Sequence, residues 1–458
     1  MSKKIVSDNS LDEKTLVAKA ISRHQLPKTT SLPLSTFIML AWRNLWRHRR
    51  RTIITLLSIA LGFGLAVFSI GLQDSGHNNM VRNAINMGDG HITLQHKDFL
   101  ASPANYRFID DGKKTLNKLS NTHINGVIAP RITLQVLAST ANNSVGIRLQ
   151  GIDPNTDPLR PLLEKNMIEG HWITTNEKRG LVIGAGMAKK LKVKIGSKII
   201  LIAGKKGGET ESHLGRVRGI FKSGILELDS YLIMSSLDFT RKFLVAEGAD
   251  INKEPLTRIA IFLNNEDDIK PVKQTLVKLF STDDAETEET PSNLAVLDWQ
   301  DMMPQLVQYI VVDDVSAYIM QIFILLVILF GIINTVLMSI LERTREFGLL
   351  RALGLKRQYL VLLVFIETLL LSFMAVACGW FVGGSIHWYV AANGIDFSGM
   401  IPEGTTFAGT FMDPVIYSEL SYSRVIQLTT IVFFTTLISG VYPAIKASRI
   451  QPIEALKT

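Results

Sequence analysis

Four long apolar segments interrupt an otherwise mixed sequence. They cover residues 52–72, 316–340, 360–390 and 425–443. A helix needs about 20 mainly apolar residues to cross the hydrocarbon core of a membrane, and each segment reaches or approaches that length. The pattern therefore predicts four transmembrane helices. A helix buried in a protein core is the alternative for each segment, chiefly for the last.

Basic residues flank these segments on one side only. They are concentrated within residues 43–51, 343–357 and 446–457, whereas the stretch 391–424 is mainly acidic. Because Lys and Arg accumulate on the cytoplasmic side of membrane proteins, both termini are predicted to be cytoplasmic. The cytoplasmic pieces are then 1–32, 341–359 and 444–458, with 391–424 as an outer loop. The net charge of +8 is a sign of membrane topology, and gives no indication of nucleic-acid binding.

The N-terminal region has two parts. Residues 1–32 are polar and lack the apolar core of a signal peptide, so we expect a cytoplasmic tail with a short helix near 11–21. Residues 33–51 are apolar and aromatic at first and cationic later, with Trp42 and Trp46 on one helical face. This pattern favours an amphipathic helix lying in the membrane interface. A simple extension of the first span is the alternative.

The insertion between the first two spans, residues 73–315, is predicted to be a large mixed α+β domain outside the cytoplasm. Alternating patterns indicate strands within 88–96, 126–140, 142–154 and 257–265. Residues 179–204 read as strand, short helix and strand, 215–235 as two strands, and 266–280 as a helix. Residues 282–292 form an acidic, solvated loop. Residues 73–86 and 305–315 are expected to continue the membrane helices outward as stalks.

Signatures of catalysis are missing from the sequence. It contains no phosphate-binding GxxxxGK[ST] loop, no HExxH and no GxSxG. The single cysteine, Cys378, can form neither an internal disulfide nor a cysteine cluster for zinc. His91 and His96 are five apart on a predicted strand and would lie on opposite faces. We therefore expect no catalytic residue, no metal site and no cofactor bound by this chain.

Two motifs resemble a known family. Residues 341–359, LERTREFGLLRALGLKRQY, are similar to the cytoplasmic coupling segment of the ABC permease superfamily that includes the MacB, FtsX and LolC/LolE proteins. Residues 440–458 are similar to the closing motif of the same superfamily. GHITL at 90–94, GIDP at 151–154 and LVIGAGMAKKLKV at 181–193 favour the lipoprotein-releasing branch. The resemblance runs from about residue 40 to the end, and the four-span topology is that of the family.

The resemblance implies that the segment after the second span is a short helix that docks into a cytoplasmic ATPase. Phe347, Leu350 and Leu353 are spaced to form one exposed apolar ridge, and Glu342 and Arg345 can pair beside it. An interfacial helix that touches only lipid is the alternative. The residues assigned to ATPase coupling are Glu342, Arg345, Glu346, Phe347, Leu350, Arg351 and Leu353. Glu367, inside the third span, either has a functional role or braces the helix ends.

The resemblance also implies a function and partners. The chain would be a permease subunit in the bacterial inner membrane, paired with an identical or homologous permease and with an ATPase dimer that binds ATP and magnesium. It would extract lipoproteins from the outer leaflet and pass them to a periplasmic carrier. The side chains proposed as a membrane wall for the lipid anchors are Phe63, Val67, Phe68, Ile70, Ile324, Val327 and Ile328. The alternatives are export of peptides or macrolides with an adaptor and an outer-membrane duct, and activation of a cell-wall hydrolase.

Overall fold

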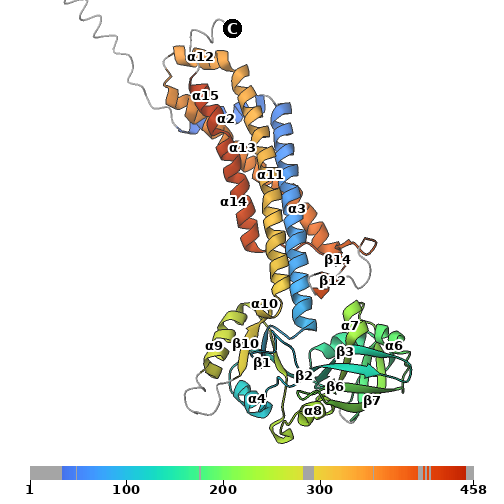
Figure 1. The fold of residues 1–458 in the computed structure, drawn as a ribbon. Coiled ribbons are helices and arrows are strands. Elements are labelled where there is room, and N and C mark those ends of the chain that lie inside the picture. The colour runs from blue at the N-terminus through green and yellow to red at the C-terminus, as the bar shows by residue number, and fades with distance from the viewer. Residues whose placement is uncertain are drawn as a thin grey trace, which may run out of the picture. The chain divides into compact units, whose positions relative to one another are not determined.

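The computed structural model describes residues 34–47, 49–174, 177–281, 293–353, 355–400, 406–407, 410–411 and 414–449. The predictions for the tail 1–32, the acidic loop 282–292 and the last residues, 450–458, lie outside these ranges. The chain divides into two compact units (Figure 1). Unit 1 comprises residues 1–67, 321–386 and 421–458, and unit 2 comprises residues 68–320 and 387–420.

Four long helices are apolar enough to cross a membrane. They are α3 (Arg49–Met87), α11 (Pro304–Glu342), α13 (Arg357–Asn393), and α14 (Tyr422–Ser439) with α15 (Val441–Ser448) continuing it after Gly440. The prediction of four membrane helices and a large domain between the first two is confirmed. Both α3 and α11 are longer than a span requires, so the predicted helical continuations after residue 72 and before residue 316 are present.

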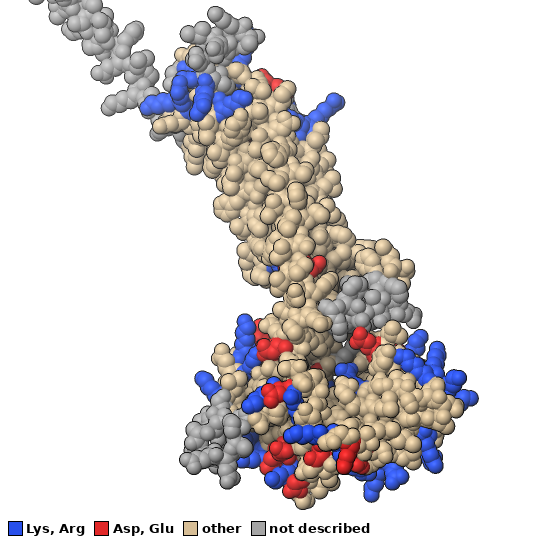
Figure 2. Space-filling view, viewed as in Figure 1, with Lys and Arg blue, Asp and Glu red and all other residues tan. Residues whose placement is uncertain are grey.

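Helix α2 (Leu34–Arg47) precedes α3 as a separate helix, in the position where the sequence predicts an interfacial one. It buries Phe37 and Ala41 against other parts of unit 1, while Leu34, Met39 and Trp42 are exposed. Its location in a membrane interface remains a prediction. In the face that Figure 2 shows, the helical part of unit 1 carries few charges, and its Lys and Arg gather at the end that holds α2.

The helices of unit 1 pack closely where glycines meet large side chains. A Cβ on Gly379 of α13 would collide with the ring of Phe63, which is fully buried. That ring also packs edge-on against Trp380, with 5.4 Å between the ring centroids. Small residues let helix backbones approach in membranes, where packing rather than water exclusion drives association. These contacts support the interpretation that the glycines of the first and third spans serve packing.

Unit 2 is built on a mixed sheet. Among the described residues its strand order is β10-β1-β9-β2-β3-β8-β5-β7-β4, and β6 pairs with β2 and β7. The strands are β1 (Ile92–His96), β2 (Gly126–Ser139), β3 (Ser144–Ile152), β4 (Met167–Gly170), β5 (Gly180–Gly184), β6 (Lys198–Gly204), β7 (Thr210–Phe221), β8 (Leu232–Ser236), β9 (Arg258–Leu263) and β10 (Leu294–Asp298). The long strand β2 joins the parts of the sheet, because it pairs with β9, β3 and β6.

Short helices cover this sheet and enclose two apolar cores. They are α4 (Gly112–Ser120), α5 (Leu159–Lys165), α6 (Ala185–Leu191), α7 (Leu226–Tyr231), α8 (Leu237–Ala246), α9 (Ile269–Ser281) and α10 (Trp299–Met302), with 3-10 turns η1 (Ile251–Lys253) and η2 (Glu266–Asp268). The larger core contains Ile132, Leu149 and Phe239, and the smaller one contains Trp172 and Phe221. The predicted strands are present, but residues 215–235 also contain α7, because Leu228 of that segment is buried at helical spacing beside Ile225.

The segment after α13 contains four very short strands. β11 (Ile395–Asp396) pairs with β14 (Val415–Ile416), and β12 (Thr406–Phe407) pairs with β13 (Thr410–Phe411). Within unit 2, Glu419 accepts hydrogen bonds from Asn78 and Arg82 of α3, each at 2.8 Å. The predicted outer loop therefore contacts the outward continuation of α3.

Candidate functional site

The predicted coupling segment forms the helix α12 (Thr344–Ala352) between α11 and α13. Arg343 lies between α11 and α12 with φ −103° and ψ 12°, outside the helical range, so the chain turns at this residue. No side chain caps the first turn of α12. Its orientation is therefore determined by what packs beneath it and by the charged groups beside it.

Phe347 fixes the inner face of α12. Its side chain is fully buried and belongs to an apolar cluster with Phe37 of α2, Ile340 of α11, Val364 of α13 and Ala444 of α15. The prediction that Phe347 lies on an exposed ridge is therefore wrong. The sequence shows only that Phe347, Leu350 and Leu353 have related directions, and tertiary packing decides which direction faces the protein.

The outer face of α12 is apolar as well. Leu349 and Leu353 expose 53% and 77% of their surface, and Leu350 exposes 37%. Successive helical residues are about 100° apart, so Leu349 points away from the buried Phe347 and joins the free face. Arg345 is also exposed, while Arg351 is half-buried. The exposed leucines 349, 350 and 353, defined here as the leucine face, replace the predicted ridge.

A buried ion pair connects the start of α12 to the third long helix. Arg343 donates a hydrogen bond to the Glu367 carboxylate at 3.0 Å, and both side chains are almost inaccessible to solvent. Asn44 of α2 donates to the same carboxylate oxygen at 2.6 Å. Glu367 thus braces three helices, which is one of the two roles that the sequence left open for it. Arg343 was not among the predicted site residues, and its position between Glu342 and Glu346 could have suggested a charged hub.

Two further ion pairs join α12 and the end of α11 to the N-terminal helices. Arg47 of α2 pairs with Glu346 at 2.5 Å, and Arg51 of α3 pairs with Glu342 at 2.9 Å. Partial burial alone would raise the pKa of Glu346, but hydrogen bonds from Arg47 and Arg343 outweigh it and lower that pKa. Glu342 contacts Arg51 and not the predicted Arg345, because the chain turns at Arg343 between them.

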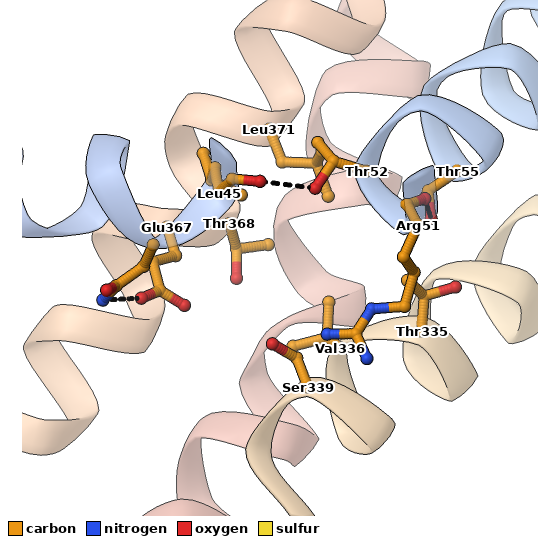
Figure 3. A pocket seen from close by; sticks show the side chains of 11 residues that line it. Leu45, Arg51, Thr52, Thr55, Thr335, Val336, Ser339, Glu367, Thr368 and Leu371 are labelled. Atoms are coloured by element: carbon orange, nitrogen blue, oxygen red, sulfur yellow. Dashed lines mark hydrogen bonds between the residues drawn. The ribbon is translucent and has the colours of Figure 1, made fainter. Parts of the chain in front are cut away.

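A small cavity lined by several polar side chains lies beside this network (Figure 3). Arg51, Thr52 and Thr55 of α3 line it with Thr335 and Ser339 of α11 and Glu367 and Thr368 of α13. Its volume is about 40 Å³, above the roughly 10–15 Å³ that a cavity needs to hold one water. Thr52 donates its hydroxyl to the Leu45 carbonyl at 2.7 Å. The space is large enough for water.

The predicted membrane wall does not form one surface. Phe63, Val67, Ile70 and Ile328 are buried within the chain, so they do not line a free surface. Phe63 and Val67 meet the glycines of α13, which is the physical reason for this correction. Phe68 and Ile324 are half-buried, and Val327 is 74% exposed. Of the predicted wall residues, Val327 is thus the one with a largely free side chain.

A second polar site holds the outer end of α3 to the sheet of unit 2. Arg131 of β2 is fully buried, and its guanidinium makes two 2.9 Å hydrogen bonds to Asp157, which is also buried. The same group donates to the carbonyl of Gly88, the residue after α3, and lies over the ring of Phe262. Carbonyls at a helix end lack partners within the helix, and Arg131 supplies one here. The sequence analysis missed this joint, since its members are far apart in the chain.

The described residues contain no group of three or more His, Cys, Asp or Glu side chains that could hold a metal ion. His91 and His96 have different partners. The Nδ1 of His91 accepts a hydrogen bond from the Leu263 amide at 3.0 Å, while His96 lies near Asp98. Burial lowers the pKa of His91, which keeps its ring neutral. These histidines are parts of the sheet and its turns.

The chain is similar in sequence to known proteins over most of its length. Residues 52–279 match the model of the MacB-like periplasmic core domain, and residues 318–452 match the model of the FtsX-like permease C-terminal region. The chain is 22% identical to the lipoprotein-releasing system transmembrane protein LolE of Haemophilus influenzae, over 93% of this chain and 100% of that one. It is 24% identical to an uncharacterized ABC transporter permease of Methanocaldococcus jannaschii, over 93% and 99%. The periplasmic region of MacB from Actinobacillus actinomycetemcomitans covers 47% of this chain and 92% of its own, with 14% identity and a TM-score of 0.33. The two family models together span both units, and the chain belongs to the FtsX/MacB superfamily of ABC transporter permeases.

Proposed function

We propose that this permease transmits movements of a partner ATPase through α12 to the domain of unit 2, and thereby releases lipoproteins from the outer leaflet of the inner membrane. As a permease of this superfamily it is a non-catalytic membrane subunit, and ATP hydrolysis takes place in a separate subunit. ATP and magnesium would be bound by that partner. The observation that carries the proposal is the construction of α12, which presents a free apolar face on a firmly held base.

The base of α12 supports a mechanical role. Phe347 is buried, and Arg343, Glu346 and Glu342 reach three different helices. The exposed ion pairs contribute only about 0–1 kcal/mol each, so the buried phenyl ring and the buried Arg343–Glu367 pair supply most of the orientation. The leucine face remains free to enter an apolar groove of the ATPase, as amphipathic helices do in many complexes. A push on α12 would then move α11 and α13 together.

The substrate assignment rests on sequence similarity. Lipoprotein release is favoured because the similarity to LolE extends over the full length of that protein. The partners would be an ATPase dimer, a second identical or homologous permease, and a periplasmic carrier. Both termini would be cytoplasmic, as the distribution of Lys and Arg predicts. The alternative functions are export of peptides or macrolides and activation of a cell-wall hydrolase.

The docking part is tested by copurification. The double change Leu349→Ser with Leu353→Ser should leave the permease folded in the membrane and remove ATPase copurification and substrate-stimulated ATP turnover. Leu40→Ser, at an exposed leucine of α2 at the same end of unit 1, is the matched control and should change neither. Full copurification in the double variant would mean that the ATPase docks elsewhere.

The substrate part is tested in proteoliposomes that contain the permease, its ATPase and a lipidated protein. ATP should release the lipidated protein to an added carrier, and the same protein without its lipid should not stimulate turnover. Stimulation by a peptide or macrolide instead would replace lipoprotein release with export.

The orientation of the chain in the membrane is tested with single cysteines in a chain lacking Cys378. An impermeant reagent added to spheroplasts should label Lys206→Cys and spare Arg50→Cys, and the reverse pattern would invert the topology.

A further inference from the structure

A second cavity opens at the same end of unit 1, beside α12. Its volume is about 570 Å³, far larger than the cavity near Glu367. Its floor is Ile340, which is buried. Its walls come from the last turn of α11, the first turn of α12 and one face of α15, and comprise Leu341, Thr344, Tyr442, Ile445, Lys446 and Arg449. We call this cavity the α15 groove.

We propose that the α15 groove binds one anionic phospholipid from the membrane leaflet at this end of the helices, with its phosphate on Lys446 and Arg449 and its acyl chain along the apolar wall. The groove has two chemical halves that match such a ligand. Leu341, Tyr442 and Ile445 expose about half of their surface, at 51%, 56% and 46%. Lys446 and Arg449 are three residues apart at the end of α15, so they lie on neighbouring parts of one helix face.

Lys446 and Arg449 differ from the other cations at this end of unit 1 because they line this large groove. Arg47, Arg51 and Arg343, at the same end of unit 1, each have a carboxylate partner. Within the part of the chain that the structure describes, neither Lys446 nor Arg449 has a carboxylate within ion-pair distance. The negative end of the α15 dipole favours some positive charge there. That effect explains the cations but does not explain a large apolar cavity next to them.

A phospholipid satisfies both halves at once. A phosphate accepts charge-assisted hydrogen bonds from a guanidinium, often two in parallel, and from an ammonium group. Tyrosine is enriched where lipid headgroups begin, and Tyr442 lies at the start of α15, directly after the membrane helix α14. Basic pockets between membrane helices on the cytoplasmic side bind anionic headgroups. A free phosphate would leave the apolar wall exposed to water, which makes it a poorer fit.

Lipid bound in the α15 groove would affect the coupling between ATPase and permease, because the walls of the groove include the turn into α12. Leu341 and Thr344 flank the residues Glu342 and Arg343, whose ion pairs hold that turn. A lipid wedged between α15 and this turn would restrict movement of α12 relative to α14. We therefore expect the ATPase activity of the assembled complex to depend on anionic lipid, and this dependence to require Lys446 and Arg449.

The experiment compares complexes of permease and ATPase in nanodiscs of phosphatidylcholine alone and with increasing phosphatidylglycerol. The readouts are ATP turnover and, for the permease by itself, lipid retained in native mass spectrometry. Anionic lipid should raise turnover, and the double variant Lys446→Gln with Arg449→Gln should need at least ten-fold more of it and lose the retained lipid. The matched control is Arg49→Gln with Arg50→Gln, which removes two exposed charges at the same end but outside the groove. It should behave as the wild type.

A second variant tests the apolar half independently. Ile445→Asn leaves both cations in place and adds no charge, but puts a polar group into the apolar wall, and it should also reduce the retained lipid. If the Lys446/Arg449 and Arg49/Arg50 double variants showed the same lipid retention and the same dependence of turnover on anionic lipid, the proposal would be overturned, because bulk surface charge would then explain the lipid effect. Loss of ATPase copurification in the groove variants, with lipid retention unchanged, would show that the groove docks the ATPase instead. Because lipid retention is measured without ATPase or substrate, failure of the proposed function leaves this test intact.

Discussion

Phe347 offers the sharpest test of how α12 is held. It is fully buried between α2, α11, α13 and α15, whereas Leu353, six residues later, exposes 77% of its surface. Phe347→Ala removes most of a buried ring, and such changes cost about 3–5 kcal/mol in protein cores. Leu353→Ala removes no internal contact of comparable size. On docking, full burial of a leucine contributes about 1.5–3 kcal/mol, so this change should weaken ATPase binding directly.

Two measurements separate these effects. Hydrogen exchange of the α12 amides is followed in the permease without ATPase, and ATPase affinity is measured by titration. Since 1.4 kcal/mol is a factor of ten, Phe347→Ala should accelerate exchange in α12 by about 100-fold or more unless the cluster collapses around the gap. Phe347→Leu should restore most of the protection. Leu353→Ala should leave exchange unchanged and weaken ATPase binding by about 10- to 100-fold.

The opposite pattern would refute this account. If Phe347→Ala abolished ATPase binding while exchange in α12 stayed at the wild-type rate, the ring would be a contact residue. Phe347 would then have to leave its cluster when the ATPase docks. If both variants left ATPase affinity unchanged, α12 would not be the docking element. Leu350, at 37% exposure, lies between the two cases and should show a smaller change in both measurements.

Three further outcomes are expected. Arg131→Met should destabilise unit 2 by about 3–5 kcal/mol in thermal unfolding of the purified permease, because it leaves the buried Asp157 carboxylate without its partner. The double change Arg131→Met with Asp157→Leu should recover most of this loss. Gly379→Val should cost about 1–3 kcal/mol and reduce folded yield, because the added atoms meet an aromatic ring, whereas Gly331→Ala, which meets nothing within 4 Å, should be neutral. Burial would raise the pKa of Asp298, but the hydrogen bond from Lys273 outweighs burial and lowers that pKa. The pair therefore stabilises β10 and α10 above about pH 4, and this stabilisation is lost as the pH falls through the lowered pKa. Lys273→Gln should remove this pH-dependent loss, and an equal pH dependence of hydrogen exchange in the variant and the wild type would contradict the prediction.

The sequence by itself determined the membrane helices, most strands of the outer domain and the family. These features depend on local patterns. An apolar run of span length forms an α-helix, because in a membrane every backbone polar group must be hydrogen-bonded within the segment. Alternation over 126–140 and 257–265 specifies strands for a similar local reason, since successive side chains point to opposite faces. The motifs at 341–359 and 440–458 are contiguous and need no fold to be recognised.

Only the tertiary structure decided which face of each element is used. The spacing of Phe347, Leu350 and Leu353 defines their relative directions, but the helices that enclose Phe347 include α2 and α15, which lie far from it in the sequence. The same holds for Phe63 of the first span, because its neighbour Gly379 lies in the third span and meets it only through the packing of α13 against α3. The Arg131–Asp157–Gly88 joint and the Arg343–Glu367 pair likewise join residues that no local pattern relates. A buried charge is stable only with a partner, and partners are chosen by packing in three dimensions, which a single sequence does not display.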